Sequence, residues 1–142
     1  MRPQCIPTWT EFGVARILIV DDDADLVARN VVALEAGGHA VAVAETTSEA
    51  LTVARGRQPD AVVLEAMLDG GQAGFDLART LATEFPTVPL LMVTRADEVL
   101  TAHERRAQDR DGGWIPVDRY LAKPVMPDVL LYVLNHALHE PD

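Results

Sequence analysis

Short apolar runs alternate with amphipathic segments along the chain, and this alternation limits the folds that the chain can adopt. The runs are four to six residues long, with a shorter one near the carboxyl end, and they cover residues 16–20, 40–43, 61–64, 89–94 and 120–122. Their length and β-branched content predict strands. The run at 61–64 is entirely apolar, which is typical of a parallel strand buried on both faces. The segments between the runs have apolar residues at helical spacing, so we expect a parallel sheet covered by helices.

Helix start and stop signals agree with this order. Val27, Val31 and Leu34 share one face of a first helix, which Gly37 and Gly38 end. Four further helices are predicted: one that begins at the capping-box sequence 46–49, then residues 75–85, 97–108 and 126–139. Five strands and five helices in alternation predict a doubly wound α/β fold of flavodoxin type, with a five-stranded parallel sheet in the order 2-1-3-4-5.

The length of 142 residues fits a single domain, which we place at residues 15–142. Residues 1–14 form an extension that carries Trp9 and Phe12, for which we expect flexibility, with docking as the alternative. Only three residues follow the last predicted helix, so we expect no output domain.

Charge and composition exclude several classes of function. The net charge of −10 disfavours nucleic acid and anionic membranes as partners, and favours proteins or cations. The single cysteine, Cys5, cannot form an internal disulfide, and the four histidines do not have zinc-site spacing. The chain has no signal-peptide pattern and no apolar run of about 18 residues, so we expect a cytoplasmic protein.

Polar and charged side chains follow the predicted strands at the point where each ends. Asp21–Asp23 follow the first strand, Glu65 the third, Thr94 the fourth and Lys123 the fifth. The carboxyl ends of parallel strands meet at one edge of a sheet, where ligands bind. Two carboxylates about 4 Å apart repel by roughly 4 kcal/mol at an effective dielectric near 20, so this cluster requires a counterion. We expect Mg²⁺ or Lys123 to supply it.

Two acids in this region have a simpler explanation. Asp23 and Asp25 stand at the start of the first predicted helix, where a side-chain oxygen caps free backbone N–H groups and negative charge is favourable. We interpret these two as helix-capping residues, and Asp21 and Asp22 as site residues.

Four short motifs resemble the receiver domain of two-component response regulators, the CheY-like family. They are ILIVDDD at 17–23, PDAVVLEAML at 59–68 followed by Gly74 and Phe75, LLMVT at 90–94, and YLAKPV at 120–125. The resemblance covers residues 16 to about 139. It implies a Mg²⁺-assisted transfer of a phosphoryl group from a kinase histidine to an aspartate at the end of the third strand.

The resemblance also implies a role for each matching residue. Asp21 and Asp22 correspond to the acidic pair, with Asp22 the direct Mg²⁺ ligand, and Met67 would offer its backbone carbonyl to the metal. The remaining positions are the switch hydroxyl Thr94, the aromatic switch Tyr120, the phosphoryl-binding Lys123, and Pro124, which often follows a cis bond.

The chain departs from the family at Glu65, which stands where the family has its phosphoacceptor aspartate. The extra methylene moves the nucleophilic oxygen by roughly 1.5 Å, and a misplacement of about 1 Å can cost on the order of 100-fold in rate. We therefore expect an atypical receiver in which aspartyl-type phosphorylation is lost or severely slowed and Mg²⁺ binding is weakened or absent. A receiver that still accepts phosphoryl, on Glu65 or on Asp69, is the alternative.

Two states remain open for such a receiver. Glu65 could imitate part of the charge of a phosphoryl group by reaching Lys123 and Thr94, which would favour the active form. It could also occupy the site without drawing Thr94 and Tyr120 inward. A single carboxylate carries less charge and fewer acceptor oxygens than a phosphate.

The segment between Thr94 and Lys123 is longer than is usual in the family and carries Trp114 and Ile115. These residues either pack over the fourth predicted helix or form a protein interface. The resemblance implies protein partners, a histidine kinase or a downstream protein, and a possible homodimer through the face formed by helix 4, strand 5 and helix 5.

An enzymatic alternative uses the same first strand. ILIVDDDAD can be matched to the start of haloacid-dehalogenase-like phosphatases, with Asp21 as nucleophile and Asp23 as general acid. The later acidic pair that such phosphatases use to hold Mg²⁺ has no counterpart. We therefore expect a signalling module and not an enzyme.

Overall fold

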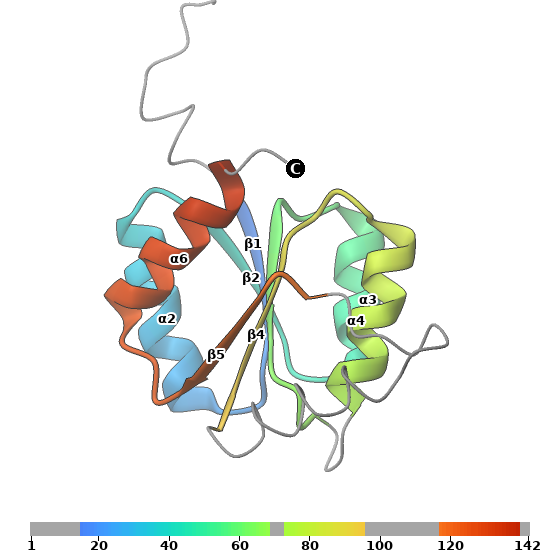
Figure 1. Ribbon diagram of the computed structural model, residues 1–142, viewed down its shortest axis with the longest axis horizontal. Coiled ribbons are helices and arrows are strands. Elements are labelled where there is room, and N and C mark those ends of the chain that lie inside the picture. Colours follow the sequence, from blue (N-terminus) through green and yellow to red (C-terminus); the bar gives the residue numbers. More distant parts are fainter. Residues whose placement is uncertain (1–14, 69–72, 96–116, 140–142) are drawn as a thin grey trace, which may run out of the picture.

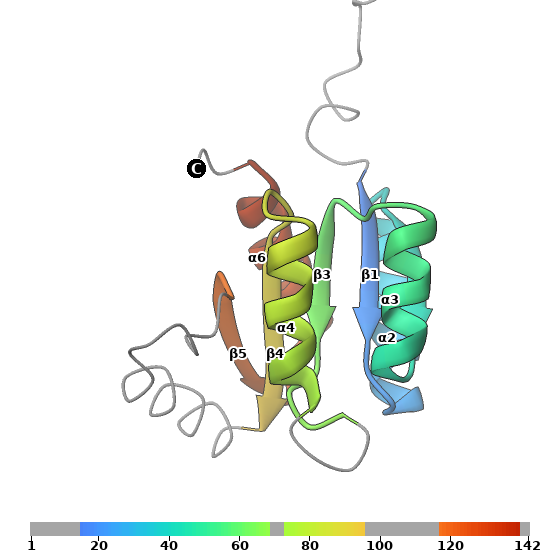
Figure 2. The same ribbon diagram turned by 90° about the vertical axis from the view of Figure 1, so that its right-hand side faces the viewer.

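The computed structural model describes residues 15–68, 73–95 and 117–139. Its five strands are β1 (Arg16–Val20), β2 (Ala40–Ala44), β3 (Ala61–Leu64), β4 (Leu90–Arg95) and β5 (Arg119–Lys123). They form one parallel sheet in the order β2-β1-β3-β4-β5, which confirms the predicted fold class and strand order. The arrows of β1, β3, β4 and β5 in Figure 2 point toward the same edge.

Four helices cover the sheet within the described ranges: α2 (Ala24–Ala36), α3 (Thr47–Gly56), α4 (Ala73–Glu84) and α6 (Pro127–His139). Helices α2 and α6 lie on one face of the sheet, and α3 and α4 lie on the other (Figure 1). The helix predicted at 97–108 falls outside the described residues. No helix in the described part of the chain is long and apolar enough to cross a bilayer.

The caps of α2 and α3 are the residues that the sequence indicates. The side chain of Asp23 accepts a hydrogen bond from the backbone N–H of Leu26 at 3.2 Å, so it is the N-cap of α2. Thr46 caps α3 in the same way through Glu49. Asp25 lies exposed in the first turn of α2. These contacts confirm the capping interpretation for Asp23 and place Asp25 where the helix dipole favours an acid.

The buried face of α2 differs in part from the prediction. Leu34 is fully buried as expected, but the residues buried with it are Leu26 and Asn30. Val27 and Val31 lie on the flank of this face and are only partly buried. Asn30 is buried because it lies four residues from both Leu26 and Leu34, on the same face of the helix. A pattern of apolar residues does not include it, because asparagine is polar.

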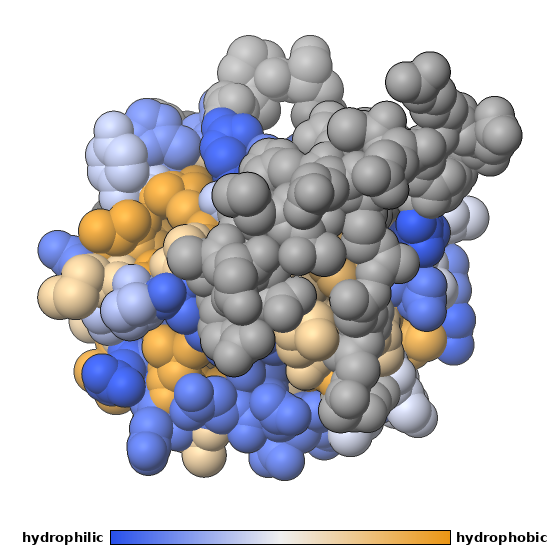
Figure 3. All heavy atoms as spheres, turned by 60° about the horizontal axis from the view of Figure 1, so that its bottom comes forward, coloured by the Kyte–Doolittle hydropathy of each residue, from blue (hydrophilic) through white to orange (hydrophobic). Residues whose placement is uncertain are grey.

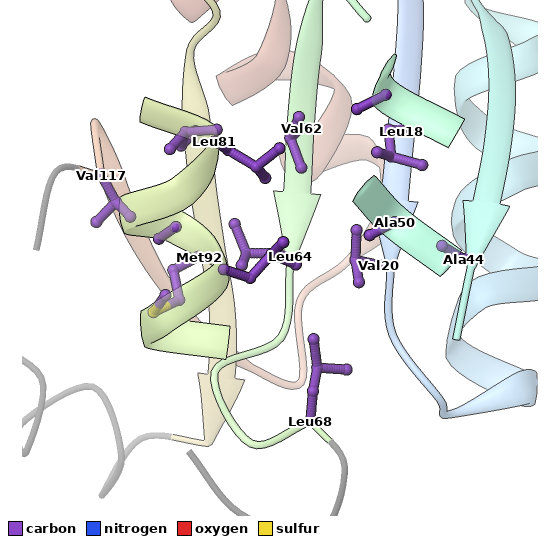
Figure 4. Packing of buried hydrophobic residues seen from close by; sticks show 14 of the residues in the cluster. Leu18, Val20, Ala44, Ala50, Val62, Leu64, Leu68, Leu81, Met92 and Val117 are labelled. Carbon is purple, nitrogen blue, oxygen red and sulfur yellow. The ribbon is translucent and has the colours of Figure 1, made fainter. Parts of the chain in front are cut away.

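The core has two layers, one on each face of the sheet. Alternate residues of a strand point to opposite faces, so β1 contributes Leu18 and Val20 to one layer and Ile17 and Ile19 to the other. Figure 4 shows the layer between the sheet and helices α3 and α4. Its labelled members are Leu18, Val20, Ala44, Ala50, Val62, Leu64, Leu68, Leu81, Met92 and Val117.

Candidate functional site

The ends of β1, β3 and β5 bring three charged side chains together. Asp21 directly follows β1, Glu65 directly follows β3, and Lys123 is the last residue of β5 rather than the first residue after it. Backbone bonds from Asp21 N–H to Ala44 and from Glu65 N–H to Val20 continue the strand pairing to the two acids. Viewed toward this end of the molecule, the described surface has hydrophilic side chains next to hydrophobic patches (Figure 3).

Lys123 lies between the two carboxylates. Its Nζ is 3.0 Å from Oδ2 of Asp21 and 2.5 Å from Oε1 of Glu65. The exposed fraction is 6% for Asp21 and 7% for Glu65, so the ion pairs are largely shielded from water. The structure therefore places Lys123 as the counterion that the two acids require.

The second oxygen of each carboxylate is held by a backbone N–H. Asp21 Oδ1 accepts a hydrogen bond from Asp23 N–H, and Glu65 Oε2 accepts one from Met67 N–H, both at 3.0 Å. Each acid thus has one oxygen on Lys123 and the other on the loop that follows its own strand. Met67 contributes its N–H to this arrangement, and the metal-binding role of its carbonyl stays a prediction.

Burial and charge shift the pKa values of two of these groups. Burial raises the pKa of Asp21 above its ordinary value, and the hydrogen bonds from Asp23 and Lys123 offset this only in part. Burial acts to lower the pKa of Lys123, but the hydrogen bonds and charges of Glu65 and Asp21 outweigh it, so the pKa of Lys123 is raised. Lys123 is therefore a cation throughout the neutral range.

The acidic residues do not form a ready Mg²⁺ site in this arrangement. Asp22, which the resemblance implies as the direct ligand, is exposed. Within the described ranges, no three His, Cys, Asp or Glu residues are grouped to hold a metal ion. The oxygens of Asp21 and Glu65 that face each other are occupied by an ammonium group instead. The weakened Mg²⁺ binding expected from the sequence stays a prediction.

The predicted switch residues, Thr94 and Tyr120, lie on β4 and β5. Neither is a member of the ion pairs that Lys123 forms. Thr94 lies within β4, which continues to Arg95, and not after the strand as the sequence indicated. It is fully buried, and among the residues that the structure describes its hydroxyl has no hydrogen-bond partner. Tyr120 is partly buried against the core layer of α3 and α4, with its hydroxyl oxygen shielded from solvent. The Lys123–Pro124 peptide bond is cis, in agreement with the family pattern.

Gly74 is a part of the site to which the sequence assigned no function. A Cβ atom at this position would lie 2.1 Å from the carbonyl oxygen of Glu65 and 2.7 Å from Cα of Ala66. The N–H of Gly74 donates to the Ala66 carbonyl at 3.0 Å. Glycine therefore lets the start of α4 contact the backbone that carries Glu65. In the sequence, the pair Gly74 and Phe75 indicates this contact.

Asp69, Trp114, Ile115, Trp9 and Phe12 all lie outside the described residues. Their suggested roles as substitute acceptor, protein interface and docking segment stay predictions.

Two curated bacterial proteins are clear relatives. Protein PilH of Pseudomonas aeruginosa is 34% identical over 128 residues, which cover 88% of this chain and 98% of PilH. The phosphate regulon transcriptional regulatory protein PhoB of the same organism is 36% identical over 124 residues, which cover 86% of this chain and 51% of PhoB. The chain thus spans about half the length of PhoB and nearly the whole of PilH.

Solved structures of response regulators are also similar to this chain. The receiver domain of NtrX from Brucella abortus matches with a TM-score of 0.76 and 25% identity, covering 88% of this chain and 99% of that one. The chemotaxis response regulator CheY4 of Vibrio cholerae, at 23% identity, shares the fold with a TM-score of 0.74 and coverage of 87% and 98%. The model of the response regulator receiver domain matches residues 17–135. The chain therefore belongs to the response regulator receiver domain family of two-component signalling.

Proposed function

We propose that this receiver acts in signal transduction through protein contacts and without conventional aspartyl phosphorylation. One observation supports the proposal above the others: Lys123 holds Glu65 and Asp21 in a buried cluster of ion pairs. In this cluster the glutamate already has the partner that a phosphoryl group would need.

The state of the Glu65 carboxylate disfavours nucleophilic attack. Both of its oxygens are engaged, Oε1 by Lys123 and Oε2 by the N–H of Met67. Phosphoryl transfer requires an oxygen in line with the leaving group, and the longer side chain displaces that oxygen. We further propose that Mg²⁺ binds weakly or not at all, because the ammonium group of Lys123 neutralises the acids that would attract it.

The same contacts favour imitation of the phosphorylated state over a merely filled site. Lys123 is drawn to Glu65 as it would be to a phosphoryl oxygen, and Tyr120 packs inward against the core. Among the described residues, the Thr94 hydroxyl forms no hydrogen bond with Glu65, so Thr94 does not contribute to this imitation. We propose a receiver held in a partly active form by the charge of Glu65.

The partners that we propose are proteins: a histidine kinase or a downstream signalling protein, or a second copy of the chain. The helix 4–strand 5–helix 5 face suggested for a homodimer includes residues outside the described ranges. A phosphatase activity has less support, because Asp23, its expected general acid, caps α2 through Leu26. The receiver family match also favours a signalling module over an enzyme.

Mass spectrometry after incubation with acetyl phosphate and Mg²⁺ tests this function. We expect the natural protein to remain unmodified and Glu65→Asp to gain the mass of one phosphoryl group, since aspartate restores the position of the nucleophilic oxygen. Glu65→Asp combined with Lys123→Met is the control, and it should lose the modification.

Stoichiometric phosphorylation of the natural protein would contradict the proposal. Peptide mapping of that product would then distinguish Glu65 from Asp69 as the acceptor.

A further inference from the structure

A cavity lies at the edge of the sheet opposite the charged cluster, where the strands begin. Its volume is about 420 Å³, and it is bounded by Ala15–Leu18, by Ala40–Ala42 of β2, by Val53 and Arg57 of α3, and by the Pro59–Asp60 turn. Ligand pockets in proteins have volumes of roughly 300–1,000 Å³. This hollow is therefore large enough to receive one or two aromatic side chains.

Small side chains on β2 create the hollow. Ala42 and Ala44 point to the α3 face of the sheet, where Ala44 is fully buried and Ala42 partly buried. Ala40 has the same orientation, because alternate residues of a strand share a face. Ala44 and Ala50, labelled in Figure 4, pack on the same face farther along β2 and are not among the residues that line the cavity. Apolar walls without packing partners lose dispersion contacts, so this space is a favourable place for an apolar group.

Two arginines and one aspartate lie at the rim of the cavity: Arg16, Arg57 and Asp60. Arg16 donates from its guanidinium to the Gln58 carbonyl at 2.9 Å, and its backbone N–H donates to the Asp60 carboxylate at 2.7 Å. The Arg57 side chain is exposed and has no ion pair with any residue that the structure describes. An occupant with large apolar groups and one acid would match both the walls and the rim.

The sequence immediately before the cavity has this composition. Residues 1–14 carry the apolar side chains Ile6, Trp9, Phe12 and Val14 and a single acid, Glu11. Ala15, the next residue, is itself part of the cavity wall. An extended chain spans up to about 3.4 Å per residue, so Phe12 can reach about 10 Å and Trp9 about 20 Å from Ala15. A tethered segment also has a high effective concentration at a site beside its attachment point.

We propose that the amino-terminal segment of this chain docks into the cavity, with Trp9 and Phe12 in the hollow and Glu11 paired with Arg57. The cavity lies at the start of the strands, on the side of the molecule away from Glu65. This docking does not depend on the state of the charged cluster.

Tryptophan fluorescence of the full chain provides the first test. Trp114→Phe leaves Trp9 as the sole tryptophan, because the chain has two. We expect blue-shifted emission and slow acrylamide quenching that do not change with protein concentration. Ala42→Leu fills the cavity and should shift the emission to the red and speed quenching. Ala28→Leu, the same enlargement at an exposed position of α2, is the matched control and should leave both unchanged.

Urea unfolding of full-length variants provides a second test that does not use fluorescence of Trp9. We expect Trp9→Ala to lower the folding equilibrium constant by about tenfold, since it removes buried apolar area. Ala42→Leu should cost less, because its own side chain fills the space that it denies to Trp9. Their double mutant should lose much less than the product of the two effects, because both act on one contact. The charge swap Glu11→Arg with Arg57→Glu should restore the stability that either single change removes.

Three results would overturn the proposal. They are an exposed Trp9 in the natural chain, effects of Trp9→Ala and Ala42→Leu that multiply independently, and protection of Trp9 that appears only at high protein concentration. The last result would assign the cavity to a second copy of the chain. Phosphorylation of Glu65→Asp by acetyl phosphate is a separate measurement, so failure here leaves the proposed function untouched.

Discussion

At the scale of single residues, one methylene group distinguishes Glu65 from the aspartate of its family. The longer side chain lets one oxygen contact Lys123 while the other accepts the N–H of Met67. Asp21 has the same two kinds of partner, a lysine and a backbone N–H. The result is a buried cation held by two acids, in which every charged group depends on the others.

Removal of Lys123 tests this dependence. We expect Lys123→Met to lower the free energy of unfolding by about 3–5 kcal/mol near pH 8, because it leaves two buried carboxylates without a counterion. Urea unfolding followed by circular dichroism measures the change. Glu65→Gln is the complementary variant, and in the Lys123→Met background it should recover part of the loss.

The raised pKa of Lys123 gives the sign of a pH effect. The native protein binds this proton more tightly than the unfolded chain, whose lysine pKa is 10.5. The stabilisation is therefore complete below pH 10.5 and is lost as the pH rises through the higher native pKa. We expect the stability difference between the natural protein and Lys123→Met to shrink as the pH is raised from 9 to 12. A constant difference would argue against the ion pairs.

At the scale of elements, the contact between α4 and the end of β3 positions Glu65. Gly74 is buried at the start of α4, and its backbone bonds to Ala66 in the loop after β3. The residue after Glu65 is thereby fixed by an element other than its own strand. The conformation of the glutamate is thus set jointly by the sheet and by the beginning of a helix.

Gly74→Ala is expected to destabilise the protein by about 1–3 kcal/mol or more, because the added Cβ meets backbone atoms that cannot rotate away. Thermal unfolding measures the change. Gly56→Ala is the matched control, since a Cβ at the end of α3 meets nothing within 4 Å. There we expect no loss and a gain of up to about 1 kcal/mol. Equal effects at the two glycines would contradict the role of Gly74.

The elements also show where sequence patterns succeed and where they do not. The strands at 16–20 and 61–64 and the caps at Asp23 and Thr46 follow from local residue types, and the structure has them at these positions. The buried face of α2 was only partly predicted, because a polar residue, Asn30, occupies its centre. The periodicity of apolar residues does not predict the burial of a polar side chain.

At the scale of the whole molecule, the charged cluster and the alanine-walled cavity lie at opposite edges of one sheet. The strands run from the cavity edge to the cluster edge, with a continuous apolar core on each face between them. The chain has a net charge of −10, so any dissolved cation reduces the repulsion between its acidic side chains. A stabilisation caused by specific Mg²⁺ binding has to be distinguished from this general screening of charge.

Thermal unfolding in the presence of Mg²⁺ makes this separation. We expect MgCl₂ to raise the Tm of the natural protein no more than NaCl does at equal ionic strength, because Lys123 already neutralises Asp21 and Glu65. Glu65→Asp should show an additional rise, since a bound ligand at about 100 times its Kd stabilises by about 2.7 kcal/mol. A Mg²⁺-specific rise in the natural protein would show that the metal displaces Lys123.

The sequence by itself determined the strands, most of the helices, the strand order and the acids and lysine that follow the strands. These depend on local periodicity and on the fixed direction of parallel strands. Only the tertiary structure decided that Lys123 bridges Asp21 and Glu65, that Met67 holds the second oxygen of Glu65, and that Gly74 must lack a side chain. It also decided that alanines on β2 leave a cavity beside α3. These features depend on distances of a few ångströms between elements far apart in the chain, and such distances are set by packing.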